Sequence, residues 1–193
     1  MIYCGIEDNE FIRGKVPMTK QEIRILTLIK ARISPTDVVY DIGAGTGSIS
    51  IEAARIANEG KVFAIERNPE GISLIRENMR KFQVDNVEVV LGEAPGALAG
   101  LPGCDTAIIG GSGRNLDSIL DIVHGRLKVG GRVIINCITI QTIASCLEYL
   151  RSHSTEFDYE AIQVQVNRLK SVGPYDMADA VNPIYIVTAI KKA

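Results

Sequence analysis

Three glycines at alternate positions follow a short apolar run that ends in an acid. The run covers residues 38–40, the acid is Asp41, and the glycines are Gly43, Gly45 and Gly47. Glycine lets the backbone approach a ligand closely and adopt positive φ, and a helix that follows such a turn offers unpaired N–H groups. The stretch therefore predicts a strand, a turn and a helix that cradle a nucleotide-type cofactor.

The spacing and charge of this loop distinguish between cofactors. A dinucleotide fingerprint needs its last glycine at the position that Ser48 occupies. Asp41 adds a carboxylate beside the loop, which repels a pyrophosphate but attracts a cation. S-adenosylmethionine carries a sulfonium and an ammonium group and has no phosphate. We therefore expect S-adenosylmethionine rather than NAD, with a glycine-rich turn that binds no ligand as the other alternative.

A second acid, Glu66, ends the apolar run at residues 61–66, 19 positions beyond Gly47. A carboxylate at the end of a second strand can accept hydrogen bonds from both hydroxyls of a ribose. This supports an adenosine-containing ligand without separating one such cofactor from another. The alternative is structural, because Glu66 could also cap the next helix or pair with Arg67.

Two further turns follow predicted strands and face the same crevice. The first, Gly92-Glu93-Ala94, would lie beside an adenine that Glu66 positions, or is a plain loop. The second, at residues 110–114, leaves room for a bulky acceptor, and its Arg114 could bind a carboxylate in bidentate fashion. Arg13 and Lys15 are further candidates for this role, and all three cations could equally be solvated. No residue has the spacing that would identify it as catalytic.

These candidates are positioned by alternating strands and helices. Apolar runs at residues 38–42, 61–66, 87–91, 107–109 and 132–137 predict five strands, with helices between them. One helix begins at Asn68-Pro69, a cap followed by proline at the first helical position. The alternation predicts an α/β fold with a parallel sheet covered on both faces and ligands at the carboxyl ends of the strands.

The two ends of the chain differ from this pattern. Thr19-Lys20-Gln21-Glu22 has the form of a capping box, so a helix should begin there; its predicted inward residues are Ile23, Leu26, Ile29 and Ile33. Near the C-terminus, residues 157–169 and 184–190 predict two strands that form an antiparallel hairpin at one edge of the sheet. Residues 171–182, which contain Gly173-Pro174, are predicted to be a long loop.

Composition limits the class of protein. The 193 residues fit one domain, and the formal net charge of −2 gives no global field that would recruit nucleic acid or an anionic membrane. No run approaches the roughly 18 apolar residues of a membrane span. Four scattered cysteines suit a reducing cytoplasm, and two isolated histidines make a protein-bound metal an unpromising hypothesis.

Several segments together carry a family resemblance. They are the arm (Gly5-Ile6-Glu7-Asp8, Phe11 and Val16-Pro17-Met18-Thr19-Lys20), the loop from Asp41 to Ser48, Ile65-Glu66-Arg67-Asn68-Pro69, and Gly110-Gly111-Ser112-Gly113. They resemble the decarboxylating cobalt-precorrin carbon-15 methyltransferases of cobalamin biosynthesis, a family of class I S-adenosylmethionine-dependent methyltransferases. The glycine loop is common to many methyltransferases, whereas the arm and the Gly-Gly-Ser-Gly turn are more specific.

The resemblance implies a fold, an activity and a set of site residues. The fold is a Rossmann-like, doubly wound and mostly parallel seven-stranded sheet with a C-terminal antiparallel hairpin, in a single domain over residues 1–193. Residues 1–20 form an N-terminal arm over the active site. The implied enzyme is a homotetramer that methylates carbon 15 of a cobalt-precorrin and removes the ring C acetate carboxyl group in the anaerobic route, and the cysteine usage adds the expectation of a cytoplasmic location. The implied cofactor contacts are Thr19, Asp41, Gly43, Ala44, Gly45, Thr46, Gly47, Glu66, Arg67, Gly92, Glu93 and Ala94, and the expected tetrapyrrole contacts are Arg13, Lys15, Gly111, Ser112 and Arg114.

Three alternatives stay open on sequence grounds. An RNA or protein isoaspartyl methyltransferase would use the same fold, although the chain lacks a basic, aromatic-rich surface signal. An NAD-dependent oxidoreductase is disfavoured by Ser48 and Asp41. A non-catalytic module that binds an adenosine ligand would show the same glycine loop.

Overall fold

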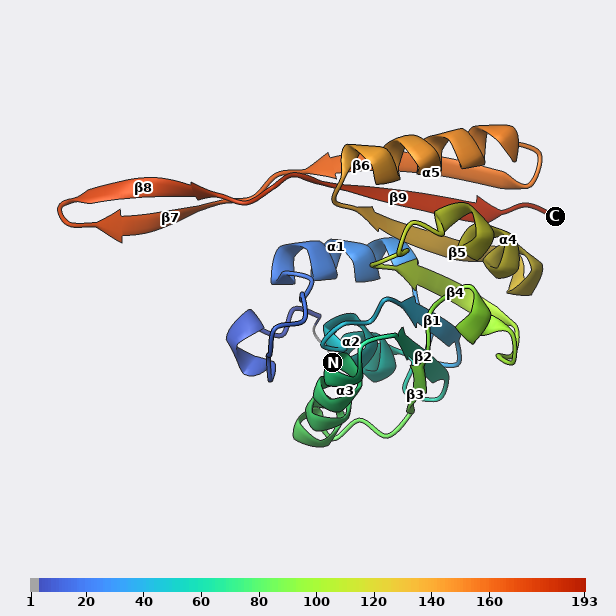
Figure 1. Cartoon of the computed structure of the whole chain (residues 1–193), viewed down its shortest axis with the longest axis horizontal. Coiled ribbons are helices and arrows are strands. Elements are labelled where there is room, and N and C mark those ends of the chain that lie inside the picture. The colour runs from blue at the N-terminus through green and yellow to red at the C-terminus, as the bar shows by residue number, and fades with distance from the viewer. Residues whose placement is uncertain (1–3) are drawn as a thin grey trace.

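A seven-stranded sheet forms the centre of the molecule, in the strand order β3-β2-β1-β4-β5-β9-β6 (Figure 1). This computed structural model describes residues 4–193, so the first three residues of the predicted arm lie outside the described part. The five strands β1 to β5 run parallel, while β9 is antiparallel to both β5 and β6. The strands of this sheet are β1 (Val38–Ile42), β2 (Lys61–Glu66), β3 (Val87–Leu91), β4 (Cys104–Ile109), β5 (Leu127–Cys137), β6 (Phe157–Val164) and β9 (Ile184–Lys191).

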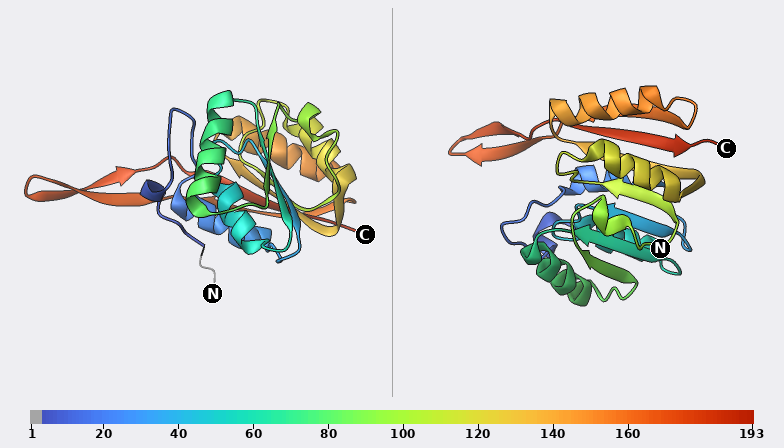
Figure 2. Two further views of the ribbon diagram at one scale, coloured as in Figure 1. Left: turned by 90° about the horizontal axis from the view of Figure 1, so that it is seen from below. Right: turned by 45° about the vertical axis from the view of Figure 1, so that its right-hand side comes forward.

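Helices cover both faces of the sheet because successive strand residues point to opposite sides. Val39 and Val62 pack in one core with α1, α2 and α3, whereas Tyr40 and Phe63 pack in a second core with α4 and α5. Figure 2 shows the two layers from further directions. The predicted α/β fold with an antiparallel edge is confirmed. The helices are α1 (Gln21–Ala31), α2 (Ser48–Ile56), α3 (Pro69–Phe82), α4 (Leu116–Arg126) and α5 (Ile140–Ser152).

The two helix starts predicted from caps are both confirmed, but the caps themselves have different outcomes. The side chain of Asn68 accepts a hydrogen bond from the Glu70 N–H at the start of α3, so that cap is confirmed. The helix start predicted at residues 19–22 is confirmed, because α1 begins at Gln21, but the capping box itself is wrong: the N-cap residue is Lys20, which is extended and makes no side-chain cap. The Thr19 carbonyl instead accepts a hydrogen bond from the Arg24 guanidinium.

The inward face of α1 also differs from the prediction. Ile23 is buried, but Ile29 is 61% exposed, and the fully buried side chains include those of Arg24 and Thr27. The face is rotated because Arg24 has partners in the interior that a pattern of apolar residues does not reveal. Its Nε lies 2.5 Å from a carboxylate oxygen of Glu52 in α2, and its guanidinium lies over the ring of Phe11.

The predicted loop at residues 171–182 is wrong, because most of it forms a two-stranded antiparallel ribbon. β7 (Asn167–Val172) and β8 (Tyr175–Ala180) pair with each other and not with the main sheet. Gly173, with φ of +61°, and Pro174 make the tight turn between them, so the Gly-Pro pair closes a hairpin. β6 ends at Val164 rather than at residue 169, and the ribbon projects away from the body of the molecule (Figure 1).

Within residues 4–193, no helix has the length and apolar character needed to cross a membrane.

Candidate active site

A cavity of about 290 Å³ lies at the carboxyl ends of the parallel strands, where the alternation of elements predicts a ligand. It brings together seven of the predicted cofactor residues. The segments that supply them are far apart in the sequence, since they follow three different strands and meet at one edge of the sheet. These seven residues are Gly43, Gly45, Glu66, Arg67, Gly92, Glu93 and Ala94.

The glycine loop has the positive φ values that its sequence predicts. Gly43 and Gly45 have φ of +76° and +58°. A Cβ atom at Gly43 would lie 2.7 Å from the backbone nitrogen of Gly111, and one at Gly45 would lie 2.6 Å from the carbonyl oxygen of Pro17. These glycines therefore permit close contact with two other segments of the chain as well as access to the cavity.

Glu66 is 93% buried and holds the loop against the end of β2. One carboxylate oxygen accepts a hydrogen bond from the Gly45 N–H at 2.8 Å, and the other accepts one from the Asn68 N–H at 2.7 Å. Each carboxylate oxygen can accept a second hydrogen bond. Glu66 can therefore position the loop and still bind hydroxyl groups of a ligand in the cavity.

Asp41 lies behind the loop rather than in the cavity wall. Its carboxylate is buried and accepts a hydrogen bond from the Ser50 hydroxyl of α2, with 2.5 Å between the oxygen atoms. The pKa of Asp41 is raised to about 6, mainly by burial and also by the nearby charge of Glu66. The hydrogen bonds from Ser50 lower the pKa but do not outweigh burial. Asp41 can therefore affect a ligand in the cavity only by the electrostatic field of its carboxylate or by positioning the glycine loop.

Charged residues in the cavity wall give it a net negative charge. Glu93 forms an ion pair with Arg67, at 2.8 Å between nitrogen and oxygen, and Glu66 adds a second carboxylate. Gly113 packs against this ion pair, since a Cβ there would lie 2.8 Å from the Glu93 carboxylate. Two carboxylates and one guanidinium suit a cationic ligand better than a pyrophosphate.

The N-terminal arm closes one side of the cavity through Val16 and Pro17. Thr19 is not part of the wall, and its carbonyl accepts a hydrogen bond from Arg24. Among the other predicted cofactor residues, Ala44, Thr46 and Gly47 form the loop backbone but are not part of the wall either. Arg13 and Lys15 are exposed on the arm, outside this cavity.

A second cavity of about 620 Å³ adjoins the first. Residues 110–113 line both cavities, so the predicted Gly111 and Ser112 stand between them, and Arg114 lines the second one. Most of the rest of its wall comes from the end of β5, the segment that follows it and the first turns of α5, and Ile138 in that segment is 59% exposed. A bulky acceptor in the second cavity would lie next to a ligand in the first.

Several wall residues were not among the predicted site residues. The rule that ligands bind beyond the carboxyl ends of strands points equally to the residues after β5, and that signal could have identified Ile138 and Thr139. This rule does not identify Val16 and Pro17, which follow no strand, although the family resemblance implies that the arm lies over the site. The wall residues that were missed are Val16, Pro17, Ile42, Ile65, Asn68, Gly110 and Gly113 in the first cavity, and Ile109, Leu116, Ile135, Asn136, Ile138, Thr139, Gln141, Thr142 and Ser145 in the second.

Known proteins resemble this chain over nearly its whole length. Residues 10–191 match the family model described as the precorrin methyltransferase domain. A Sulfolobus acidocaldarius protein named "Probable cobalt-precorrin-6B C(15)-methyltransferase (decarboxylating)" is 41% identical, over 97% of this chain and 98% of its own. A Salmonella typhimurium protein named "Cobalt-precorrin-6B C(15)-methyltransferase (decarboxylating)" is 35% identical, over 97% of this chain and 96% of its own.

A solved structure shows the same fold over nearly the whole chain. It is that of a Geobacter metallireducens precorrin-6Y C5,15-methyltransferase, with a TM-score of 0.90 and 42% sequence identity. The match covers 97% of this chain and 98% of the other.

Proposed function

The chain belongs to the precorrin methyltransferase family and is a methyltransferase, and on that basis we propose that it methylates carbon 15 of a cobalt-precorrin. The same reaction removes the ring C acetate carboxyl group as carbon dioxide. Relatives named as decarboxylating C(15)-methyltransferases support this assignment. The structural observation that carries the proposal is the wall at residues 110–113, which the two cavities share, since a cofactor in the first cavity would lie beside an acceptor in the second.

S-adenosylmethionine is the proposed cofactor, and the charge of the first cavity supports it. Glu66 would bind the ribose hydroxyls, and the turn at residues 92–94 would contact the adenine. The loop from Asp41 to Gly47 would carry the methionine part, with the arm above it. The net negative wall favours the sulfonium and ammonium groups and opposes the pyrophosphate of NAD. When bound, this cofactor supplies an electrophilic methyl group.

The second cavity would hold the tetrapyrrole. Its exposed apolar side chain Ile138 suits the ring, and Arg114 suits one of the carboxylate side chains. Arg13 and Lys15 lie outside both cavities, so on this proposal they bind only parts of the substrate that protrude. Gly111 and Ser112 would stand between the two ligands, and their small size would let the ligands come close together.

The task of the protein in this chemistry is positioning. Methyl transfer is an in-line displacement, so the walls must hold the acceptor carbon about 3 Å from the methyl carbon and exclude water. The tetrapyrrole supplies the electrons of the new bond. Its conjugated ring accepts the electron pair that remains when the acetate side chain loses carbon dioxide, and no strong base from the protein is required for either step.

Mass spectrometry of the reaction product tests the proposal. Purified protein is incubated with S-adenosylmethionine and a cobalt-precorrin that retains the ring C acetate. The expected product has gained one methyl group and lost one carbon dioxide. A protein that binds S-adenosylmethionine but leaves the tetrapyrrole unchanged and methylates RNA or isoaspartyl peptides would contradict the proposal, as would one that binds NAD instead.

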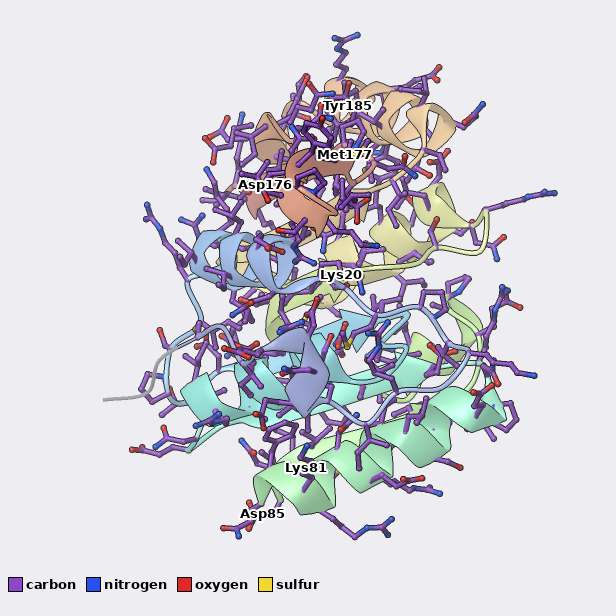
Figure 3. All side chains as sticks on the ribbon, turned by 90° about the vertical axis from the view of Figure 1, so that its left-hand side faces the viewer. Lys20, Lys81, Asp85, Asp176, Met177 and Tyr185 are labelled. Carbon is purple, nitrogen blue, oxygen red and sulfur yellow. The ribbon has the colours of Figure 1, made fainter. Side chains whose placement is uncertain are left out.

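A homotetramer is proposed for the assembly, and the hairpin supports self-association. Every residue of β7 and β8 is exposed, including the apolar side chains of Leu169, Val172, Tyr175 and Met177. Figure 3 looks at the molecule from the hairpin side and labels Met177 and Asp176 on it. An isolated two-stranded hairpin is only marginally stable in water, so its apolar side chains favour burial against further copies of the chain.

We also propose a cytoplasmic location. Cys104, Cys137 and Cys146 are buried and free, and Cys4 is free and half-buried. Free thiols of this kind are typical of a reducing compartment.

A further inference from the structure

The N-terminal arm is bound to the body of the molecule by side chains from three helices. Arg24 of α1 donates hydrogen bonds to the carbonyls of Ile6 and Thr19, and Glu52 of α2 accepts one from the Gly5 N–H at 2.5 Å. Lys81 of α3 donates to the Glu10 carbonyl. Figure 3 labels Lys81 on α3, at the side of the arm opposite to α1. The contacts at Gly5, Ile6 and Glu10 hold the arm before it reaches the cavity, and the contact at Thr19 holds it after Pro17.

Asn78 of α3 differs from these anchors because it binds the arm and the glycine loop at once. Its side-chain oxygen accepts a hydrogen bond from the Ile12 N–H at 2.8 Å. Its nitrogen donates to the carbonyl of Ile12 at 3.1 Å and to the carbonyl of Thr46 at 3.0 Å. Both hydrogens of the amide nitrogen are used, and the side chain is completely buried.

The amide group of Asn78 has one orientation that satisfies these three bonds. With its oxygen and nitrogen exchanged, the oxygen would face the carbonyls of Ile12 and Thr46, and the nitrogen would face an N–H group. An apolar side chain would leave the three backbone groups without these partners, and a buried polar group without a partner is costly. The residue therefore has a specific polar role rather than a packing role.

The part of the loop that Asn78 holds is also the part that contacts Glu66 and the inner end of the arm. Gly45 donates its N–H to Glu66, and Pro17 passes so close that a Cβ at Gly45 would lie 2.6 Å from its carbonyl oxygen. Thr46 follows immediately in the sequence. Residues 45 and 46 are thus held by Glu66 at the Gly45 N–H, by Asn78 at the Thr46 carbonyl and by the arm at Pro17.

We propose that Asn78 is a positioning residue that couples closure of the arm to the geometry of the glycine loop. The inference rests on the proposed function, because the ligand that benefits is S-adenosylmethionine in the first cavity. A loop in its binding geometry stabilises the closed arm, and a closed arm stabilises the loop. Such coupling is reciprocal. If closure of the arm raises the affinity for the cofactor by a certain factor, binding of the cofactor raises the equilibrium constant for closure of the arm by the same factor.

Asn78→Ala tests this coupling with two measurements. The dissociation constant for S-adenosylmethionine, measured by calorimetry, should rise about 5- to 30-fold, which corresponds to losing the net effect of one or two hydrogen bonds. In turnover assays KM for S-adenosylmethionine should rise by a similar factor while kcat at saturation is retained. Trypsin should cut faster after the exposed Arg13 and Lys15, and the cofactor should protect these sites less than in the wild type.

Asn86→Ala is the matched control. Asn86 also uses its side-chain nitrogen to bind backbone carbonyls, those of Ala54 at 3.0 Å and Ala57 at 2.7 Å. It immediately precedes β3, at the opposite end of the strand from the cavity. Its loss should lower Tm without changing cofactor affinity or cleavage at the arm, so the comparison separates general destabilisation from coupling.

Ile12→Pro tests the same contact from the arm. Proline removes the N–H that donates to Asn78 and leaves α3 intact, so it decides the question if Asn78→Ala does not fold. It should weaken S-adenosylmethionine binding and speed cleavage at Lys15. Wild-type affinity in both variants would overturn the role of Asn78 while the proposed function stands. A wild-type protein that does not bind S-adenosylmethionine would contradict the proposed function itself.

Discussion

The carboxylate of Glu66, at the end of β2, accepts a hydrogen bond from the backbone N–H of Gly45 at 2.8 Å. Its other oxygen accepts a hydrogen bond from the N–H of Asn68, at the start of α3. One buried side chain therefore ties together a strand end, the glycine loop and the beginning of a helix. Because the same carboxylate faces the cofactor cavity, the loop geometry and the proposed ribose site depend on each other.

Glu66→Gln should weaken binding of S-adenosylmethionine by about 10- to 100-fold. An amide has one acceptor atom, so it can satisfy the N–H of Gly45 or of Asn68 but not both, and hydrogen bonds to a charged group contribute about 1.5–3 kcal/mol. Calorimetry measures the change. Glu88→Gln on the neighbouring strand β3 is the control, because Glu88 is exposed and pairs with Lys61 away from the cavity. Equal affinity in the Glu66 variant and the wild type would refute the role of Glu66.

Asp41→Asn should stabilise the protein at neutral pH and weaken cofactor binding. The pKa of Asp41 is raised from 3.8 to about 6 in the folded state, mainly by burial. Between pH 3.8 and about 6, the folded state holds a proton on Asp41 that the unfolded state has released. The folded protein therefore has the full stabilising effect of the protonated carboxyl group below about pH 4, and it loses this effect as the pH rises through 6. The loss amounts to at most about 3 kcal/mol, and the Asn variant avoids it.

Urea unfolding at several pH values measures this effect. The variant should exceed the wild type in unfolding free energy at about pH 7.5, and the difference should shrink toward about pH 4. The exposed Asp85, labelled on α3's side of the molecule in Figure 3, provides the control substitution Asp85→Asn. A difference between wild type and the Asp41 variant that stays constant with pH would show that this carboxyl does not titrate as described.

Arg114→Ala should raise KM for the tetrapyrrole by about tenfold and leave S-adenosylmethionine affinity unchanged. Arg114 lines the second cavity but not the first, and a guanidinium paired with a carboxylate contributes on the order of 1 kcal/mol or more. Replacing Arg13 and Lys15 together should have a smaller effect, because both lie outside the cavities. Arg76→Ala on the exposed side of α3 is the control. Weaker S-adenosylmethionine binding in the Arg114 variant would contradict this prediction, because it would show that Arg114 contributes to the cofactor site.

Leu169→Asp combined with Tyr175→Asp should dissociate the proposed tetramer into smaller species. The two side chains are 77% and 73% exposed in the single chain, and each large apolar side chain that an interface buries contributes about 1.5–3 kcal/mol. Sedimentation velocity measures the assembly. The control carries Ile29→Asp and Val129→Asp, which replace apolar side chains outside the hairpin that are 61% and 64% exposed. Similar dissociation in the control, or none in the hairpin variant, would remove the hairpin from the interface.

The sequence alone was sufficient for the main architecture and for the core of the first cavity. Period-two and helical patterns are local properties, so the order of strands and helices follows from them, and parallel strands necessarily bring their carboxyl ends together. Glu66 and the glycines at 43 and 45 could be identified because their types and spacing reflect backbone and hydrogen-bonding requirements of the turn itself. The family resemblance came from the same segments and is confirmed.

Tertiary structure alone decided what depends on contacts between distant segments. Arg24 is buried in α1 because Glu52 and the arm supply its partners, and a helical pattern of apolar residues cannot show them. Asp41 turns its carboxylate to Ser50 because the packing of α2 sets that direction. The contact of Asn78 with Ile12 and Thr46 joins residues 66 and 32 positions away. Such pairings follow from how the elements pack, since no local spacing encodes them.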